Sequence, residues 1–306
     1  MISYKFIKRL FKTLSLILVL LILSITMLNI YFELKINREF KNKLENSSLL
    51  NIDGVNIYYK EYGEGEPLLL IHGFLASSLD FNNIIEPLSK KNKIITVDLP
   101  GFGQSDKPLN YDYTKRNIAS TLYKLMKKKG YESFSVLGHS MGGEVALNMA
   151  YYYSKDIKSL ILVDSAGYKK VKNLNLSPFI LEKVFVSYIP QISMNLKAFS
   201  NKSTFDKYIF DGDFYFNNKI PGKVLKKFNE DSDSGSLAPY IKELTCKTLI
   251  LWGDKDPSIP LDDAYKFNND IKNSKLVIFD QVGHYPHMEA KELFLEQVIS
   301  FLATSQ

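Results

Sequence analysis

A serine flanked by glycines, between a strand-like and a helix-like segment, constrains this sequence most. Residues 133–150 read SFSVLGHSMGGEVALNMA. The alternating apolar residues at the start predict the end of a buried strand, and apolar residues at helical spacing follow the glycines. Between the two segments lies Gly138-His139-Ser140-Met141-Gly142, the pattern of a nucleophile elbow.

The glycines of this pattern have a steric reason. The turn is so tight that side chains two residues before and two after the serine would clash with neighbouring backbone, which requires Gly138 and Gly142. The turn raises the Ser140 hydroxyl clear of the sheet and directs the N-terminus of the helix at it. Ser140 is therefore a candidate nucleophile. The alternative is a glycine-rich turn with an incidental serine, and only partners elsewhere in the chain can decide between the two.

Residues 1–32 have the features of a membrane segment. Thr13 to Phe32 carry no charge, and four cations precede them, namely Lys5, Lys8, Arg9 and Lys12. About 20 apolar residues match a hydrocarbon core of ~30 Å. We predict an uncleaved anchor with a cytoplasmic N-terminus and the remaining chain outside. The alternative is a cleaved signal peptide and a secreted protein, but no small-x-small cleavage site follows the run.

The charge balance fits this interpretation. The formal net charge is +6 over 306 residues, and the four N-terminal cations leave the rest of the chain close to neutral. We interpret the excess as a membrane-topology signal and expect no nucleic-acid partner. Cys246 is the single cysteine, which excludes an intrachain disulfide and a cysteine-based zinc site. With only four histidines besides, we expect no metal and no cofactor.

The remaining chain predicts one α/β domain. Residues 33–49 are mixed in charge and helix-prone, as a linker would be, and residues 50–306 form the domain. Strands are expected in residues 51–62 (two), 68–71, 93–97, 134–137, 159–163, 248–252 and 276–279, and helices in 80–90, 113–129 and 293–302. Strands that alternate with helices favour a mostly parallel sheet with right-handed crossovers.

One interval, at about residues 168–246, breaks this alternation. It lacks a strong strand but carries apolar clusters at helical spacing and an aromatic run from Phe205 to Phe216. A structureless loop of this length is implausible, so we predict a helical cap inserted after a strand. The aromatic residues are expected to form the core of the cap, and a further hypothesis is that some of them line an acyl pocket.

A serine nucleophile needs a base, and the base needs an acid to orient it. Two loops after predicted strands offer these groups: Asp254 and Asp256 follow residues 248–252, and His284 follows residues 276–279. Strand C-termini carry the functional groups in open α/β sheets. The chain order of serine, acid and histidine is the order found with nucleophile elbows.

In this order the motifs HGF, DLPGFGQSD, GHSMGG, WGDKDP and VGH resemble those of the α/β-hydrolase superfamily in its capped form. The resemblance covers about residues 50–303. It implies an α/β-hydrolase fold, with an eight-stranded-type, mostly parallel sheet and helices on both faces. It also implies Ser140 as nucleophile, His284 as base and Asp256 as the acid that orients it. The oxyanion hole would consist of the backbone N–H groups of Phe74 and Met141.

Other polar residues near these motifs are expected to have supporting roles. Asp254 would cap its turn, and Asp164 is an alternative position for the acid in this family. The residues expected to be structural are His72, Asp98, His139 and His287. The nucleophile identity narrows the family further, because dehalogenases and epoxide hydrolases use aspartate at the elbow.

The resemblance therefore implies acyl transfer to water, with an ester, thioester or monoacylglycerol as the substrate. The expected partners are a small-molecule or lipid-like ester and, through residues 1–32, a membrane. One alternative is a C–C bond hydrolase with the same triad and cap. Another is a non-catalytic binding protein that kept the fold. The sequence does not indicate an oligomeric state.

Overall fold

The centre of the computed structural model, which describes residues 4–41, 48–168, 176–232 and 236–304, is one eight-stranded sheet. The strand order is β1-β2-β4-β3-β5-β6-β7-β8. The strands are β1 (Leu49–Ile52), β2 (Val55–Tyr62), β3 (Glu66–Ile71), β4 (Asn92–Val97), β5 (Phe134–His139), β6 (Ile157–Val163), β7 (Lys247–Gly253) and β8 (Ser274–Phe279). β2 pairs antiparallel with β1 and β4, and every other pairing is parallel. The predicted α/β fold with a mostly parallel sheet is confirmed.

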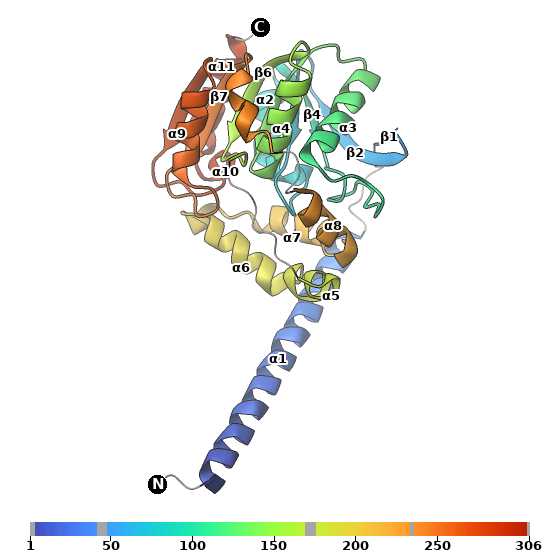
Figure 1. Ribbon diagram of the computed structural model, residues 1–306, viewed down its shortest axis with the longest axis vertical. Coiled ribbons are helices and arrows are strands. Elements are labelled where there is room, and N and C mark those ends of the chain that lie inside the picture. The colour runs from blue at the N-terminus through green and yellow to red at the C-terminus, as the bar shows by residue number, and fades with distance from the viewer. Residues whose placement is uncertain (1–3, 42–47, 169–175, 233–235, 305–306) are drawn as a thin grey trace.

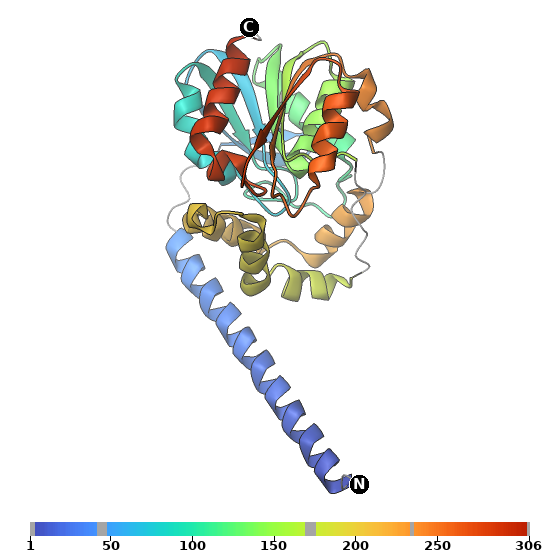
Figure 2. The same cartoon turned by 90° about the vertical axis from the view of Figure 1, so that its left-hand side faces the viewer.

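Helices cover both faces of the sheet (Figure 2). The main ones are α2 (Asn82–Ser89), α3 (Lys115–Lys128), α4 (Met141–Tyr152), α9 (Leu261–Asp270) and α11 (Lys291–Ala303). In β3, Leu68 and Leu70 pack into the cluster that contains α2 and α11, whereas Leu69 and Ile71 pack into the cluster of α3, α4 and α9. Burial on both faces explains why this strand reads as an unbroken apolar run.

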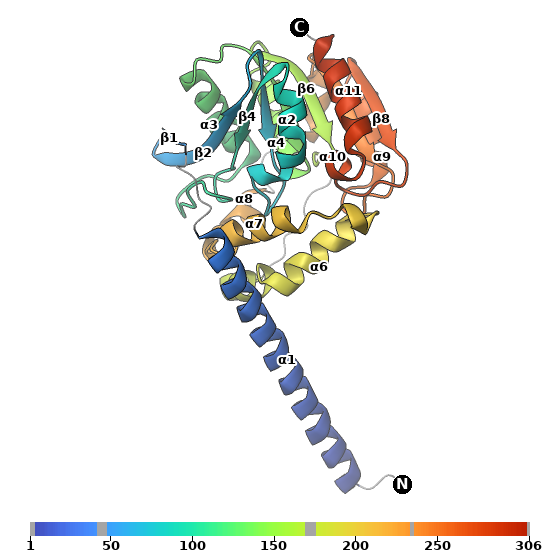
Figure 3. The ribbon, with the colours of Figure 1, turned by 180° about the vertical axis from the view of Figure 1, so that it is seen from behind.

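In its described residues, the interval between β6 and β7 contains helices joined by short loops and no strand. Its elements are α5 (Pro178–Ile180), the π-helix η2 (Leu181–Phe185), α6 (Tyr188–Ala198), η3 (Lys202–Thr204), α7 (Lys207–Asn217), α8 (Gly222–Ser232) and η4 (Ala238–Glu243). These helices lie between the sheet and the N-terminal helix (Figures 1 and 3). Asn217 hydrogen-bonds to Leu75 and Gly103, in the loops after β3 and β4. The helices therefore stand over the carboxyl ends of the strands, while their separation as a cap domain at 168–246 stays a prediction.

The N-terminal helix α1 (Tyr4–Phe40) extends beyond the predicted anchor and projects away from the rest of the molecule (Figure 1). It is the one helix in the described ranges that is long and apolar enough to cross a membrane. Residues 33–40, which we predicted as part of a linker, continue this helix and pack on the domain. Ile36 and Phe40 are buried, and the Phe32 ring stacks on Tyr188 at 4.3 Å between centroids.

The aromatic run of the interval supplies the other side of this contact. Phe210, Phe214 and Tyr215 form one buried cluster with Tyr188 and the α1 side chains. These aromatic residues thus join α6 and α7 to α1, as the core of a helix–helix contact. Their packing partner lies outside the interval, which the apolar pattern within residues 168–246 could not indicate.

We predict that Phe40→Ala destabilises the protein by about 3 to 5 kcal/mol, because it leaves a cavity in this aromatic cluster. Thermal unfolding of the full-length protein in detergent should show a lower midpoint. Phe11→Ala is the matched control on the same helix, since Phe11 is 68% exposed and should change stability by about 0.5 kcal/mol or less. Equal midpoints for the two variants would contradict the docking of α1 on α6 and α7.

Candidate active site

Ser140 lies at the turn from β5 into α4, with φ 54° and ψ −120°. A residue other than glycine at such positive φ is strained, and strain of this kind is found at functional sites. The glycines allow the turn to close. A Cβ atom on Gly138 would lie 2.3 Å from the carbonyl oxygen of Gly142, and one on Gly142 would lie 2.2 Å from that of Ile71. Both approaches exclude any side chain, in agreement with the steric argument from the sequence.

His284 lies in the loop after β8, where it meets an acid from the loop after β7. Its Nδ1 is 2.7 Å from Oδ2 of Asp256. The other carboxylate oxygen of Asp256 accepts hydrogen bonds from the backbone N–H groups of Ser258, at 2.6 Å, and Ile259, at 3.1 Å. The Asp256 side chain is fully buried, and that of His284 is 8% exposed. These contacts fix the carboxylate and, through it, the orientation of the imidazole.

The charge state of Asp256 follows from the same contacts. Burial opposes ionisation, but the positive field and hydrogen bond of His284, together with the two backbone N–H groups, hold the pKa of the carboxyl below its usual range. Asp256 is therefore an anion at neutral pH. An anion beside Nδ1 favours the tautomer that carries its proton there and leaves Nε2 free to accept one.

The two other acids near His284 differ from Asp256 in their surroundings. Asp254 accepts hydrogen bonds from the Lys255 ammonium at 2.6 Å and from the backbone N–H of Val282 at 3.3 Å, so it holds its own turn. Asp164, just after β6, accepts one from the backbone N–H of Gly253 at 3.0 Å. Burial, with a smaller contribution from the Asp256 charge, raises the pKa of Asp164 well above the usual range. Asp164 is therefore harder to ionise than Asp256 and is the poorer anionic partner for His284.

The two predicted oxyanion donors flank Ser140. Met141 is the first residue of α4, where backbone N–H groups have no partner within the helix. Phe74 follows Gly73, and a Cβ atom on Gly73 would lie only 3.2 Å from the Cβ of Ser140. The ring of Phe74 contacts Phe228 of α8 at 5.6 Å between centroids. The helices over the sheet therefore reach this side of the site.

Glu289 supports the His284 loop, which the sequence analysis did not recognise. One of its carboxylate oxygens accepts from the backbone N–H of Gly283 at 3.0 Å, and the other accepts from Ser200 and Asn201 at 2.9 Å each. The backbone N–H of His284 donates to the carbonyl of Ala198, the last residue of α6, at 2.8 Å. The base loop is thus tied to the helical interval. No motif marks Glu289, because its partners are distant backbone groups.

The remaining histidines are buried beside the site. His72 donates from Nδ1 to the carbonyl of Gly73, and its Nε2 accepts from the backbone N–H of Leu99, at 2.7 and 2.9 Å. His139 contacts Asp80 and the backbone of His284. Burial is the main cause that lowers the pKa of His287 to about 3, so this ring is neutral. The sequence analysis did not single out Asp80.

The sequence and the structure of the chain both resemble those of known hydrolases. Residues 66–291 match the model of a family described as alpha/beta hydrolase fold. Lipase 1 of Psychrobacter immobilis is 34% identical over 269 residues, which cover 82% of this chain and 81% of that protein. A 2-hydroxy-6-oxo-6-(2'-aminophenyl)hexa-2,4-dienoic acid hydrolase of Metapseudomonas resinovorans is 27% identical and covers 83% of this chain and 90% of its own. A crystal structure described as a candidate lipase of Acinetobacter baumannii has a TM-score of 0.73 and 28% identity, and covers 90% of this chain and 96% of its own.

The raised pKa of Asp164 predicts how the stability of the protein changes with pH. A carboxyl whose pKa is raised by folding stabilises the protein at low pH, and this contribution is lost as the pH rises through the raised pKa. Asn at position 164 cannot titrate but keeps an oxygen for the Gly253 N–H. The melting temperature of Asp164→Asn relative to wild type should therefore increase as the pH rises above the ordinary carboxyl range.

Asp254→Asn is the control, because its stability relative to wild type should change with pH in the opposite way. The Lys255 hydrogen bond lowers the pKa of Asp254, so its contribution is present at neutral pH and lost on acidification. The melting temperature of this variant should be lower than that of wild type at neutral pH, and the difference should disappear as the pH falls. A difference for Asp164→Asn that stays constant from acid to alkaline pH would mean that Asp164 does not hold a proton.

Proposed function

The chain belongs to the α/β hydrolase family, and from that premise we propose that it is a serine hydrolase that cleaves carboxylic esters of lipid-like molecules. The nucleophile is Ser140, the base is His284 and the acid that orients the base is Asp256. The single observation that carries the proposal is the 2.7 Å contact between His284 Nδ1 and a fully buried, backbone-bonded Asp256 carboxylate. A protein that only binds a ligand has no need of such an oriented imidazole.

The reaction follows the chemistry of these groups. His284 Nε2 takes the hydroxyl proton of Ser140 as the oxygen attacks the ester carbonyl, while Asp256 holds the imidazolium in place. The backbone N–H groups of Phe74 and Met141 donate to the developing oxyanion, which is worth about 3 kcal/mol for each donor. His284 then returns the proton to the leaving alcohol. Water, activated by His284, releases the acid from the acyl-enzyme.

Two observations favour an ester over the C–C bond alternative. The lipase of Psychrobacter immobilis is 34% identical to this chain, against 27% for the dienoic acid hydrolase. The chain also carries a long apolar helix, which would hold the site close to lipid substrates. Thioesters and monoacylglycerols fit the same mechanism, and a series of p-nitrophenyl esters of graded chain length would define the acyl preference.

We further propose that α1 remains uncleaved and anchors the domain outside the cytoplasmic membrane. The apolar residues of α1 from Leu14 to Ile30 are all exposed, by 41% to 68% of their surface, as lipid-facing residues would be. Two residues of the apolar run contact the folded domain: Phe32 stacks on Tyr188, and Asn29 Oδ1 accepts from the backbone N–H of Ile189 at 2.8 Å. Cleavage after the apolar run would remove both contacts, which supports retention of the helix.

The mechanism predicts the kinetics of single substitutions. Ser140→Ala and His284→Ala should each lower kcat for ester hydrolysis by on the order of 10⁴-fold or more, and the double variant should lose little more, because these residues act as a unit. Ser140→Ala should also abolish covalent labelling by a fluorophosphonate. Asp256→Asn should lower kcat far more than the control Asp254→Asn, which changes an acid in the same turn. Activity that survives in Ser140→Ala would refute the acyl-enzyme. If Asp254→Asn lowered kcat more than Asp256→Asn, the proposed role of Asp256 would be wrong.

The anchor predicts where the protein is found. Full-length protein should fractionate with membranes and resist extraction by carbonate and by high salt, since about 20 apolar residues hold it there. A reporter fused to the C-terminus should be accessible from outside intact cells. N-terminal sequencing provides the opposing outcome, because a soluble mature protein that begins beyond Phe32 would establish a signal peptide instead.

A further inference from the structure

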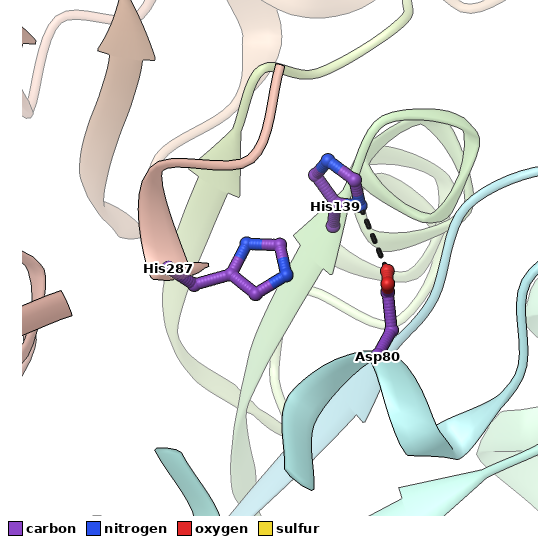
Figure 4. A group of neighbouring side chains, drawn as sticks. All are labelled: Asp80, His139 and His287. Atoms are coloured by element: carbon purple, nitrogen blue, oxygen red, sulfur yellow. Dashed lines mark hydrogen bonds and ion pairs between the residues drawn. The ribbon is translucent and has the colours of Figure 1, made fainter. Parts of the chain in front are cut away.

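Three side chains of the kinds that can bind a metal lie together beside the proposed base: Asp80, His139 and His287 (Figure 4). The rings of His139 and His284 are 4.9 Å apart between centroids. Asp80 belongs to η1 (Ser78–Phe81), His139 to the end of β5 and His287 to the short helix α10 (Pro286–Glu289). One potential ligand atom from each lies within 4.8 Å of the other two. All three residues are almost completely buried, with at most 3% of their surface exposed. This arrangement was not expected from the sequence, which indicated no metal.

The hydrogen bonds of His139 require a proton or a cation between its ring and Asp80. Its Nε2 is 2.8 Å from the backbone carbonyl of His284, and a carbonyl oxygen can only accept, so Nε2 carries the proton. Nδ1 of a neutral ring then presents a lone pair, and it faces Oδ2 of Asp80 at 3.2 Å. Two acceptors at this distance repel each other unless a proton or a metal cation lies between them.

His287 distinguishes the cation from the proton. Among the described residues, neither of its ring nitrogens makes a hydrogen bond of regular geometry, and the backbone of Asp80 is the one hydrogen-bonding group beside the ring, although the residue is 1% exposed. Figure 4 shows one ring nitrogen of His287 on the side that faces Asp80, while the other lies on the opposite side of the ring. A proton on His139 would satisfy the pair with Asp80 but would leave the lone pair of His287 without a partner, and buried polar groups without a partner are rare because they are costly. A cation coordinated by all three side chains would use the lone pair of His287 as well.

We propose that Asp80, His139 and His287 together bind one divalent transition-metal ion. Two imidazoles and one carboxylate are a ligand set that suits Zn²⁺ and related ions. The bond from His139 Nε2 to a backbone carbonyl is the outer contact that metal-bound histidines commonly make, because it fixes the tautomer. A nearby buried acid, Asp213, accepts a hydrogen bond from the Ser77 hydroxyl and lies outside this ligand set.

The ion would have a structural role at the proposed active site. His139 directly precedes Ser140, and its ring holds the backbone of His284. Asp80 and His287 come from segments 59 and 148 residues away from His139 along the chain. Coordination would therefore fix the nucleophile turn and the base loop relative to one another. The inference rests on the contacts of these three side chains and does not depend on the substrate.

The test measures metal in tag-free, full-length protein in detergent. Inductively coupled plasma mass spectrometry should find about one divalent transition-metal ion per chain. Protein freed of metal by a chelator should take up about one Co²⁺, seen as visible ligand-field absorption, and Zn²⁺ should displace it. The chelator should also lower the melting temperature, because the ion joins three separate segments.

Variants assign the ion to these residues. Asp80→Asn and His287→Gln should each weaken Co²⁺ binding by at least about tenfold, as loss of a ligand does. Asp213→Asn is the matched control: a buried neighbouring acid outside the ligand set, which should bind Co²⁺ as wild type does. Absence of stoichiometric metal and of Co²⁺ absorption in the wild type would overturn the proposal in favour of a protonated His139. A Co²⁺ band that persists in His287→Gln would overturn it too. Fluorophosphonate labelling reports the state of Ser140 separately.

Discussion

The close approach of backbone at the Ser140 turn is the constraint on which the site depends. Gly138 and Gly142 allow β5 and α4 to meet with no room for a side chain, and the cost is a serine held at φ 54°. The strain is sustained by the parallel strands on either side, which are buried on both faces. Because the turn leaves the sheet at the carboxyl ends of its strands, the loops after β6, β7 and β8 all reach the same place.

Electrostatics separates the acids that meet there. Asp164 and Asp256 lie side by side and are both shielded from solvent, yet burial raises the pKa of the first, while His284 and two backbone N–H groups lower the pKa of the second. Two neighbouring carboxyls with opposite states resolve the problem of like charges in a small volume. Deeper in the molecule, burial and the charge of Asp80 raise the pKa of Asp213 in the same way.

The helical interval links the site to the N-terminal helix. On one side it contacts Phe74 through Phe228 and holds the His284 loop through Ala198 and Glu289. On the other side its aromatic residues enclose Ile36 and Phe40 of α1. A membrane helix that packs on these elements would set the distance and tilt of the site relative to the lipid surface, so substrate access would depend on the same aromatic cluster.

The sequence by itself determined the sheet, the elbow and the apolar helix, because these are recorded in local periodicity and in glycine spacing. Each predicted strand is observed, whereas α9, in which Ala264 and Phe267 are the fully buried apolar residues, was too polar to be predicted. Contacts between distant segments have no local pattern. Only the tertiary structure therefore decided that α1 continues to Phe40 and docks on aromatic residues, that Glu289 holds the His284 loop, and that Asp80, His139 and His287 meet. These features depend on the packing of buried groups from distant parts of the chain, and the spacing of residues along the sequence does not reveal such contacts.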